Sequence, residues 1–396
     1  MIEYQICWDW GSLFLYLFLS FLAWFCILQA QKDRKENQPV KLLNRYYVFW
    51  FIVWVFIAVF RKVDAGGVGG KDAFSYKDYF EYCLDVVQTN NFSYRAEVTY
   101  RLFNKGLRYL TANYHWLFFI VYGLITFSFI YFVNENINKY INAIPLIIIF
   151  YSYLVFFNVM RNGFAIGFCL IATVQLERNN DKRAIVFFVL AILMHTASVV
   201  YAGFYVFYKI YRKKGSINIR KVALYVFLFT GFGLVLRNLI LSDRLSFGSL
   251  GTPLKFYFSR SIESGFFEDY WKIVVTQLIM AIAFIVFDKQ INEYINAISD
   301  MQDQQRLIYI RLMCIYDLIM VPLCYLAHDF RAVHYFFIPR LLMWGILLNV
   351  VKKYFTKNSW VFLYECSGVV FIAYMIFRIY NNYEMSGLMP WVLDLF

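Results

Sequence analysis

The stretch YHWLFFIVYGLITFSFIYFV (residues 114–133) runs for 20 residues without a lysine, an arginine or an acidic side chain. A helix of this length is about 30 Å long, which matches the hydrocarbon thickness of a bilayer. The sequence predicts an all-α polytopic membrane protein of roughly 11–12 transmembrane or half-membrane helices, forming one integral membrane domain over residues 1–396. The apolar segments fall at 11–30, 46–60, 114–133, 143–160, 163–177, 184–195, 197–210, 222–240, 271–287, 307–327, 335–350 and 359–379.

The composition supports this class. Of the 396 residues, 61% are hydrophobic and 16% are charged, whereas soluble domains carry roughly 25% charged residues. The net charge of +12 suits an anionic membrane surface. Because no compact basic soluble domain is present, nucleic acid is not an expected partner. The seven cysteines show no CxxC and no metal-ligand spacing, so we expect neither a disulfide framework, nor a metal site, nor a bound cofactor.

Positive charge predicts how the chain is oriented in the membrane. Loops rich in lysine and arginine remain cytoplasmic, and three clusters mark such loops: 32–45, 212–221 and 352–357. The N-terminus is then outside the cell. The same rule places two long loops outside, 61–113 and 241–270.

The segment 184–210 is expected to break near His195. As one continuous helix it would carry the basic cluster at 212–221 to the outer side, against the charge rule. A break within His195-Thr196-Ala197-Ser198 keeps the rule and leaves two arms too short for an ordinary crossing. The alternative is a single tilted helix with one buried histidine.

The polar loop 61–113 is the first candidate for function. It is too long for a simple connector, and it holds a glycine cluster at 66–70 that would let the backbone turn tightly or approach a ligand. Its chemically versatile residues are Asp72, Glu97 and the tyrosines at 76, 79 and 100. The opposing interpretation is a flexible surface linker with a short helix through Tyr76–Phe80.

Arginine is enriched on the predicted outer side. This topology puts 11 arginines and 6 lysines outside, against 8 and 13 inside. A guanidinium is planar, always charged and able to fork onto phosphate oxygens. The pattern predicts an outward-facing cavity for an anionic headgroup, with a diphosphate as the expected chemistry. Snorkelling arginines and loop salt bridges are the alternative.

Four segments, read in order, carry a resemblance. They are Arg61…Gly66-Gly67…Asp72…Tyr76, Glu97-Val-Thr-Tyr100, Met160-Arg161-Asn162-Gly163-Phe-Ala165 and His195-Thr-Ala-Ser198, followed near the end by Pro390-Trp391. Their order, spacing and predicted side resemble the EpsG-type branch of the Wzy polysaccharide polymerases. Asn162 stands where that family usually has glutamine, and Thr-Ala-Ser replaces a basic residue followed by serine.

The resemblance implies an activity. Such polymerases resemble C-type (GT-C) membrane glycosyltransferases with an outer-side cavity, and they join oligosaccharide repeat units for O-antigen, capsule or exopolysaccharide. The units are carried on undecaprenyl diphosphate at the outer face of the bacterial cytoplasmic (inner) membrane, and undecaprenyl diphosphate is the leaving group. The implied partners are these lipid-linked substrates, membrane lipid, and the flippase and chain-length regulator proteins of the same pathway.

Candidate residues follow from the chemistry of that transfer. The leaving diphosphate needs cationic groups, for which we select Arg61, Arg161, Arg331 and Arg340. The acceptor hydroxyl needs a base, for which His195 and Asp72 are rivals. Glu97 would orient an arginine or bind sugar hydroxyls, although it could also pair with Arg101 one helical turn later. The predicted sugar contacts are Tyr76, Tyr79 and Tyr100.

Two other classes compete with this interpretation. An O-antigen-ligase-like enzyme or an O-acyltransferase could also use His195 in a membrane cavity. A lipid-linked sugar flippase or transporter would not be an enzyme at all. A transporter is expected to have pseudo-symmetric halves with matched broken spans, and residues 222–379 show no counterpart of the break at His195.

Overall fold

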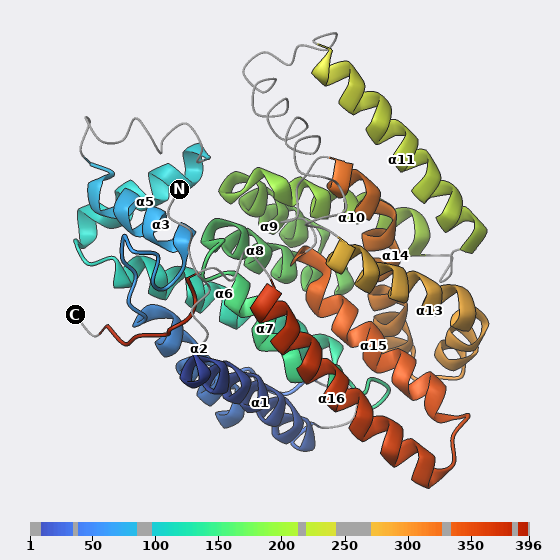
Figure 1. Ribbon diagram of the computed structural model, residues 1–396. Helices are drawn as coiled ribbons and strands as arrows, with labels where there is room; N and C mark the ends of the chain where they lie inside the picture. Colours follow the sequence, from blue (N-terminus) through green and yellow to red (C-terminus); the bar gives the residue numbers. More distant parts are fainter. Residues whose placement is uncertain are drawn as a thin grey trace. The chain divides into compact units, whose positions relative to one another are not determined.

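The computed structural model describes residues 9–34, 39–84, 97–212, 219–242, 271–326, 334–381 and 387–394. Within these ranges the regular structure is helical, apart from an isolated antiparallel bridge between Arg61 and Leu393 (Figure 1). The predicted all-α class is therefore confirmed. The chain forms two compact units, Met1–Val199 with Val351–Phe396, and Val200–Val350.

The first unit contains most of the helices. They are α1 (Trp10–Lys32), α2 (Arg45–Val59), α3 (Lys71–Tyr82), α5 (Val98–Leu110), α6 (His115–Asn136), η1 (Ile144–Ile148), α7 (Ile149–Val155), α8 (Met160–Glu177), α9 (Asp181–Met194), η2 (Thr196–Ser198) and α16 (Lys357–Asn381). Helix α10 (Val199–Tyr211) leads into the second unit, which also holds α11 (Ile219–Leu241), α13 (Trp271–Asn296), α14 (Met301–Leu326) and α15 (Phe337–Lys352).

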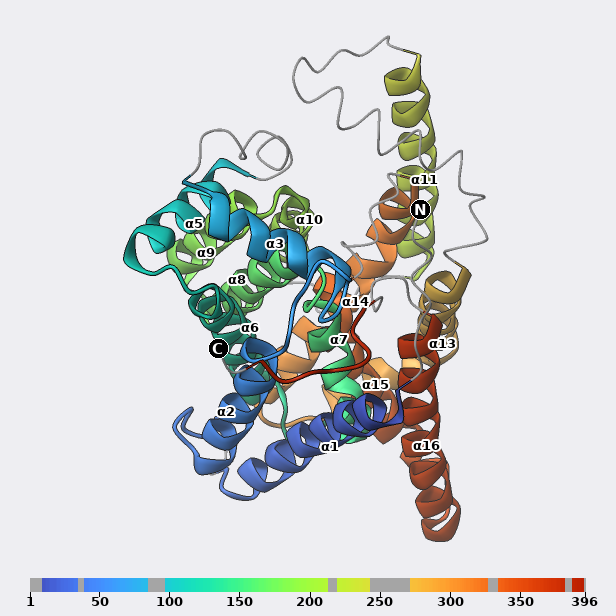
Figure 2. The same cartoon turned by 60° about the vertical axis from the view of Figure 1, so that its left-hand side comes forward.

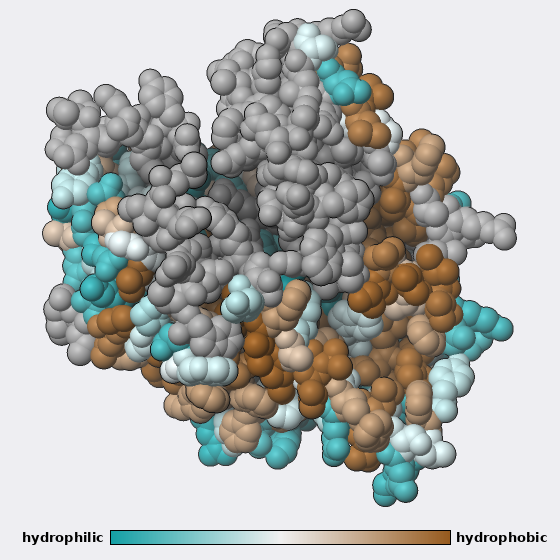
Figure 3. Space-filling model, viewed as in Figure 1, coloured by the Kyte–Doolittle hydropathy of each residue, from teal (hydrophilic) through white to brown (hydrophobic). Residues whose placement is uncertain are grey.

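Four of the described helices are long and apolar enough to cross a membrane. They cover Trp10–Lys32, His115–Asn136, His334–Lys352 and Lys357–Tyr380. On α16 the apolar side chains Phe362, Val369 and Val370 are exposed, as expected of a surface in contact with lipid. Brown, apolar side chains also gather in the lower and right-hand parts of the face in Figure 3.

The described residues contain fewer full-length apolar helices than the twelve apolar segments suggest. The segment 143–160 is split, because η1 and α7 end at Val155 and a turn leads to α8. Helix α14 is 26 residues long, but it carries Asp303, Arg306, Arg311 and Asp317. Charged side chains are costly in the hydrocarbon layer unless they are paired. Asp303 pairs with Arg306, while Arg311 and Asp317 pair with residues of other helices in the second unit. The finer number of 11–12 membrane helices stays a prediction.

An aromatic core holds the first unit together. Helix α6 packs against α2 and α8, while α1 packs against α2 and α7. At the centre of this packing, the rings of Trp54 and Tyr153 lie 4.6 Å apart, and those of Trp54 and Phe150 lie 4.9 Å apart. Each such pair adds about 0.5–1.5 kcal/mol beyond burial, so α2 and α7 form a firm support for the loop that follows α2.

The predicted loop 61–113 is partly helical, since it contains α3 and α5. A glycine turn precedes α3, with φ of 78° at Gly69 and 114° at Gly70. A Cβ at Gly69 would overlap the carbonyl oxygen of Lys62, and one at Gly70 would lie 2.6 Å from Asn158 Oδ1. The expected tight turn is therefore present, and it fixes where α3 begins. The expected approach of the backbone to a ligand stays a prediction.

The predicted break at His195 is confirmed. Helix α9 ends at Met194, His195 is extended with φ of −157° and ψ of 115°, and the short helix η2 follows. The Ser198 hydroxyl donates to the carbonyl oxygen of His195 at 2.8 Å. In a continuous α-helix this carbonyl would accept a hydrogen bond from a backbone N–H one turn later. The Ser198 hydroxyl supplies a partner in its place, so the serine of the motif helps to hold the break.

Candidate active site

Glu97 joins three of the sequence motifs. Its side chain is 14% exposed and lies at the start of α5. Oε2 accepts a bond of 2.6 Å from Arg161 Nη1, and Oε1 lies 3.0 Å from His195 Nδ1. The backbone N–H of Thr196 also donates to Oε1 at 2.9 Å. Residues 64 and 98 positions apart from Glu97 thus meet on one carboxylate.

Arg161 occupies the first turn of α8, where a cation is unfavourable because the helix dipole is positive at that end. The Glu97 carboxylate offsets this cost. The guanidinium carbon lies 5.8 Å from the ring centre of Tyr100 and 5.9 Å from that of Tyr76. Three of the predicted site residues therefore surround this arginine, which is 8% exposed.

The hydrogen bonding of His195 determines its tautomer. An ionised carboxylate can only accept hydrogen bonds, so Nδ1 must carry the proton shared with Glu97. In the neutral imidazole, Nε2 then holds the lone pair. His195 is 8% exposed, and Nε2 has no hydrogen-bond partner among the residues that the structure describes. A buried polar atom without a partner is costly, so this nitrogen is suited to receive a ligand or a proton.

The Glu97 carboxyl has an unusually low pKa. Burial raises it, but the hydrogen bond with His195 and the charge of Arg161 lower it more, so the pKa falls from 4.5 to about 2. The carboxylate is therefore ionised at every pH at which the protein would work, as the tautomer argument requires.

This low pKa predicts how stability depends on pH. Because its pKa is lower in the folded state, ionised Glu97 adds on the order of 3 kcal/mol to the free energy of unfolding. This contribution is complete above pH 4.5 and is lost as the pH falls towards 2. We expect thermal unfolding of the purified protein, recorded between pH 2 and 6, to show the midpoint of wild type approaching that of Glu97→Gln as acid is added. If the difference between the two unfolding midpoints stayed constant over this range, Glu97 would not have the low pKa assigned to it.

Arg61 has a different environment from Arg161. It is 1% exposed. Its guanidinium donates to the carbonyl oxygens of Ala58, Gly69 and Phe157 and to the Tyr122 hydroxyl. These contacts join α2, the glycine turn, α6 and the turn before α8. These contacts are those of an anchoring residue, and the diphosphate contact expected from the sequence stays a prediction.

Asp72 and Tyr79 lie on α3, and no contact of either with the Glu97 carboxylate is seen. Asp72 is half-buried in the first turn, and its backbone N–H donates to Asn158 Oδ1 at 3.1 Å. Asn158 itself precedes α8 by two residues, so it ties the start of α3 to the helix that carries Arg161. Tyr79 is 4% exposed. The roles predicted for both residues remain predictions.

The described part of the chain includes one of the other two predicted arginines. Arg331 and the loop residues 243–270 lie outside the described residues. Arg340 belongs to the second unit, where its Nε lies 3.3 Å from Asp317 Oδ2 in a buried ion pair. Asp317 was missed at the sequence level because a single carboxylate within an apolar segment shows no partner.

Two further residues of the site were not selected from the sequence. Thr196 holds Glu97 through its backbone N–H, and Asn158 contacts the glycine turn. Thr196 lies within the His195–Ser198 motif, so the sequence already marked the segment that contains it. Nothing in the sequence around Asn158 predicts its role, because that role depends on a glycine turn far away in the chain that folds against it.

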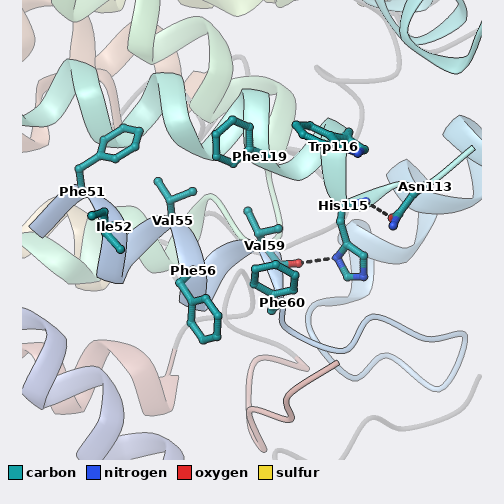
Figure 4. Close-up of a pocket in the computed structure, with 10 residues that line it drawn as sticks. All are labelled: Phe51, Ile52, Val55, Phe56, Val59, Phe60, Asn113, His115, Trp116 and Phe119. Carbon is teal, nitrogen blue, oxygen red and sulfur yellow. Dashed lines mark hydrogen bonds between the residues drawn. The ribbon is translucent and has the colours of Figure 1, made fainter. Parts of the chain in front are cut away.

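An apolar groove lies between α2 and the start of α6 (Figure 4). Its volume is about 440 Å³, and its polar lining residues are Asn113 and His115. His115 Nδ1 lies 2.9 Å from the carbonyl oxygen of Val59. None of the residues selected from the sequence lines this groove. We therefore place the candidate active site at the Glu97 cluster, within the first unit.

The chain was compared with known proteins. No curated protein and no solved structure gives a significant match, so the resemblance to the C-type glycosyltransferase fold stays a prediction. The model of the EpsG family matches residues 45–393, a range that includes Arg61, Glu97, Arg161, His195 and Trp391. The chain therefore belongs to the EpsG family, whose members are Wzy-type polymerases.

Proposed function

We propose that this protein is a polysaccharide polymerase that joins undecaprenyl-diphosphate-linked oligosaccharide repeat units at the outer face of the bacterial cytoplasmic membrane. The observation that carries the proposal is the bridge from Glu97 to Arg161 and His195. It puts a cation and a potential base on the two oxygens of one carboxylate. A transfer away from a diphosphate needs both kinds of group.

In the proposed reaction, a hydroxyl of the acceptor unit attacks the anomeric carbon of the growing chain. A new carbon–oxygen bond forms, and the bond from that carbon to the diphosphate oxygen breaks. The bonding electron pair leaves with undecaprenyl diphosphate. The hydroxyl proton passes to His195 Nε2, because Nδ1 already carries the proton bonded to Glu97. The imidazolium that forms is stabilised by the same carboxylate.

Arg161 would stabilise the charge that develops on the leaving diphosphate. A guanidinium has five N–H donors, so the ion pair with Glu97 is compatible with further bonds to phosphate oxygens. The protein environment already holds this cation in place through Glu97, Tyr76 and Tyr100. Preorganised charge of this kind costs no reorganisation during the reaction.

The tyrosines are proposed to act mainly by shaping the site. Tyr100 is fully buried and Tyr76 is 5% exposed, and their rings meet edge to face at 6.2 Å. Tyr76 contacts Arg161 directly, and we assign it the sugar-facing position at the edge of the cluster. We also propose that the protein works beside the flippase and chain-length regulator that supply and terminate its substrate.

A reconstituted reaction tests this function. Purified protein supplied with an undecaprenyl-diphosphate-linked repeat unit is expected to give a ladder of longer lipid-linked glycans, and one undecaprenyl diphosphate is set free at each transfer. His195→Gln should abolish the ladder, since an amide cannot accept the proton. His115→Gln is the matched control, because His115 is equally buried but bonded to the Val59 carbonyl.

Other products would decide against the proposal. Transfer to a different acceptor would indicate a ligase or an acyltransferase. Movement of the intact lipid across a vesicle membrane without any covalent change would indicate a transporter.

A further inference from the structure

We propose that the segment Gly387–Asp394 is a positioning element of the active site. It would hold the glycine turn and α3 so that Tyr76 lies against Arg161. The part of this inference that concerns the polymerisation rate rests on the proposed function. The structural contacts that carry it all lie in the first unit and are independent of that function.

The segment docks on both ends of the loop between α2 and α3. At the start of the loop, the Lys62 N–H donates to the Val392 carbonyl oxygen and the Asp394 N–H donates to that of Phe60, both at 2.7 Å. At its end, the Gly70 N–H donates to the Gly387 carbonyl oxygen at 3.1 Å. Figure 2 shows the segment, in dark red, running beside the blue loop.

Side chains fix the docked segment from two sides. The Trp391 Nε1–H donates to the carbonyl oxygen of Ile57, at the end of α2, at 3.3 Å. The Trp391 backbone N–H donates to the Ser12 hydroxyl on α1 at 2.6 Å. These bonds attach the segment to two apolar helices, so it is held independently of the loop that it contacts.

Two routes then connect the segment to α3. A Cβ at Gly70 would lie 3.2 Å from Leu388 Cδ2, so this leucine packs against the residue that precedes the helix. The Tyr114 hydroxyl donates to Asp394 Oδ2 at 3.0 Å, and the Lys77 ammonium of α3 lies 4.2 Å from the centre of the Tyr114 ring. Tyr76 is the neighbour of Lys77. A displaced segment would therefore displace the wall of the site that faces Arg161.

The test compares wild type with a chain that ends after Asn381. We expect at least a roughly 10-fold loss of polymerisation rate, because small displacements of catalytic groups are costly. The buried thiol of Cys83, just after α3, reports the position of that helix. Its labelling by N-ethylmaleimide, mapped by peptide mass, should become at least roughly 10-fold faster. The buried thiol of Cys169 on α8 should label as slowly as before, which excludes global unfolding.

A finer variant keeps the proposal testable if the shortened chain does not fold. Trp391→Phe removes the bond to Ile57 and should slow polymerisation by about 2- to 10-fold. Trp116→Phe makes the same change at a 54% exposed position and should leave the rate unaltered. Unchanged Cys83 labelling in a shortened chain whose Cys169 still labels slowly would overturn the proposal. So would a Trp391→Phe protein with both the polymerisation rate and the Cys83 labelling of wild type. Because the labelling needs no substrate, it tests the role of the segment in holding α3 even if the wild-type protein forms no polymer.

Discussion

Replacing Arg161 with lysine is expected to reduce polymer formation by about 100-fold or more while the protein still inserts in the membrane. Lysine keeps the positive charge but loses the planar fork that bonds a carboxylate and phosphate oxygens together. The ammonium can satisfy Glu97, as Arg161 Nη1 does at 2.6 Å, but it cannot hold the diphosphate in the same geometry. The measurement is the ladder of lipid-linked products at matched amounts of protein.

Arg178→Lys provides the matched control. Arg178 caps the other end of α8, and its ion pair with Glu135 is 2.7 Å long. The substitution is therefore the same and again affects an arginine–glutamate ion pair, but it lies at the opposite end of α8 and outside the site; the Arg178 side chain is also more exposed, at 44%. Wild-type polymerisation is expected for this variant. Full-length polymer from the Arg161→Lys protein would rule out Arg161 as a bidentate diphosphate ligand.

Glu97→Gln is expected to lower both activity and stability. The amide keeps the shape of the side chain but removes the negative charge between Arg161 and His195. Arg161 would then be buried without its counterion, a change that costs about 3–5 kcal/mol in other proteins. The amide can also donate towards Nδ1, which removes the tautomer that leaves Nε2 as a base. We expect a polymerisation rate about 100-fold lower and a lower unfolding temperature.

Glu135→Gln separates these two effects. Glu135 is buried and paired with Arg178, so its substitution should also lower the unfolding temperature. The rate per folded molecule should nevertheless stay at the wild-type value. If both variants lost activity in proportion to stability, Glu97 would be a structural residue and the proposed base assignment would fail.

The location of the site could be inferred from the sequence more reliably than the partners of each residue. The motif order singled out Glu97, Arg161 and His195, and these three do meet. Arg61 belongs to the same series of motifs and lies, like Arg161, at the end of an apolar segment. A sequence pattern cannot distinguish an arginine that faces a ligand from one that binds four backbone and tyrosine oxygens, since both cases need a buried guanidinium.

The sequence by itself determined the helical membrane class and the break at His195. Both depend on local composition, because apolar length and the placement of charged residues act within one segment. Only the tertiary structure decided that Glu97 bridges Arg161 and His195, that Arg61 donates to backbone and tyrosine oxygens, and that Gly387–Asp394 pairs with the glycine turn. These contacts join residues far apart in the chain, and their geometry is fixed by how the helices pack rather than by the spacing of the motifs.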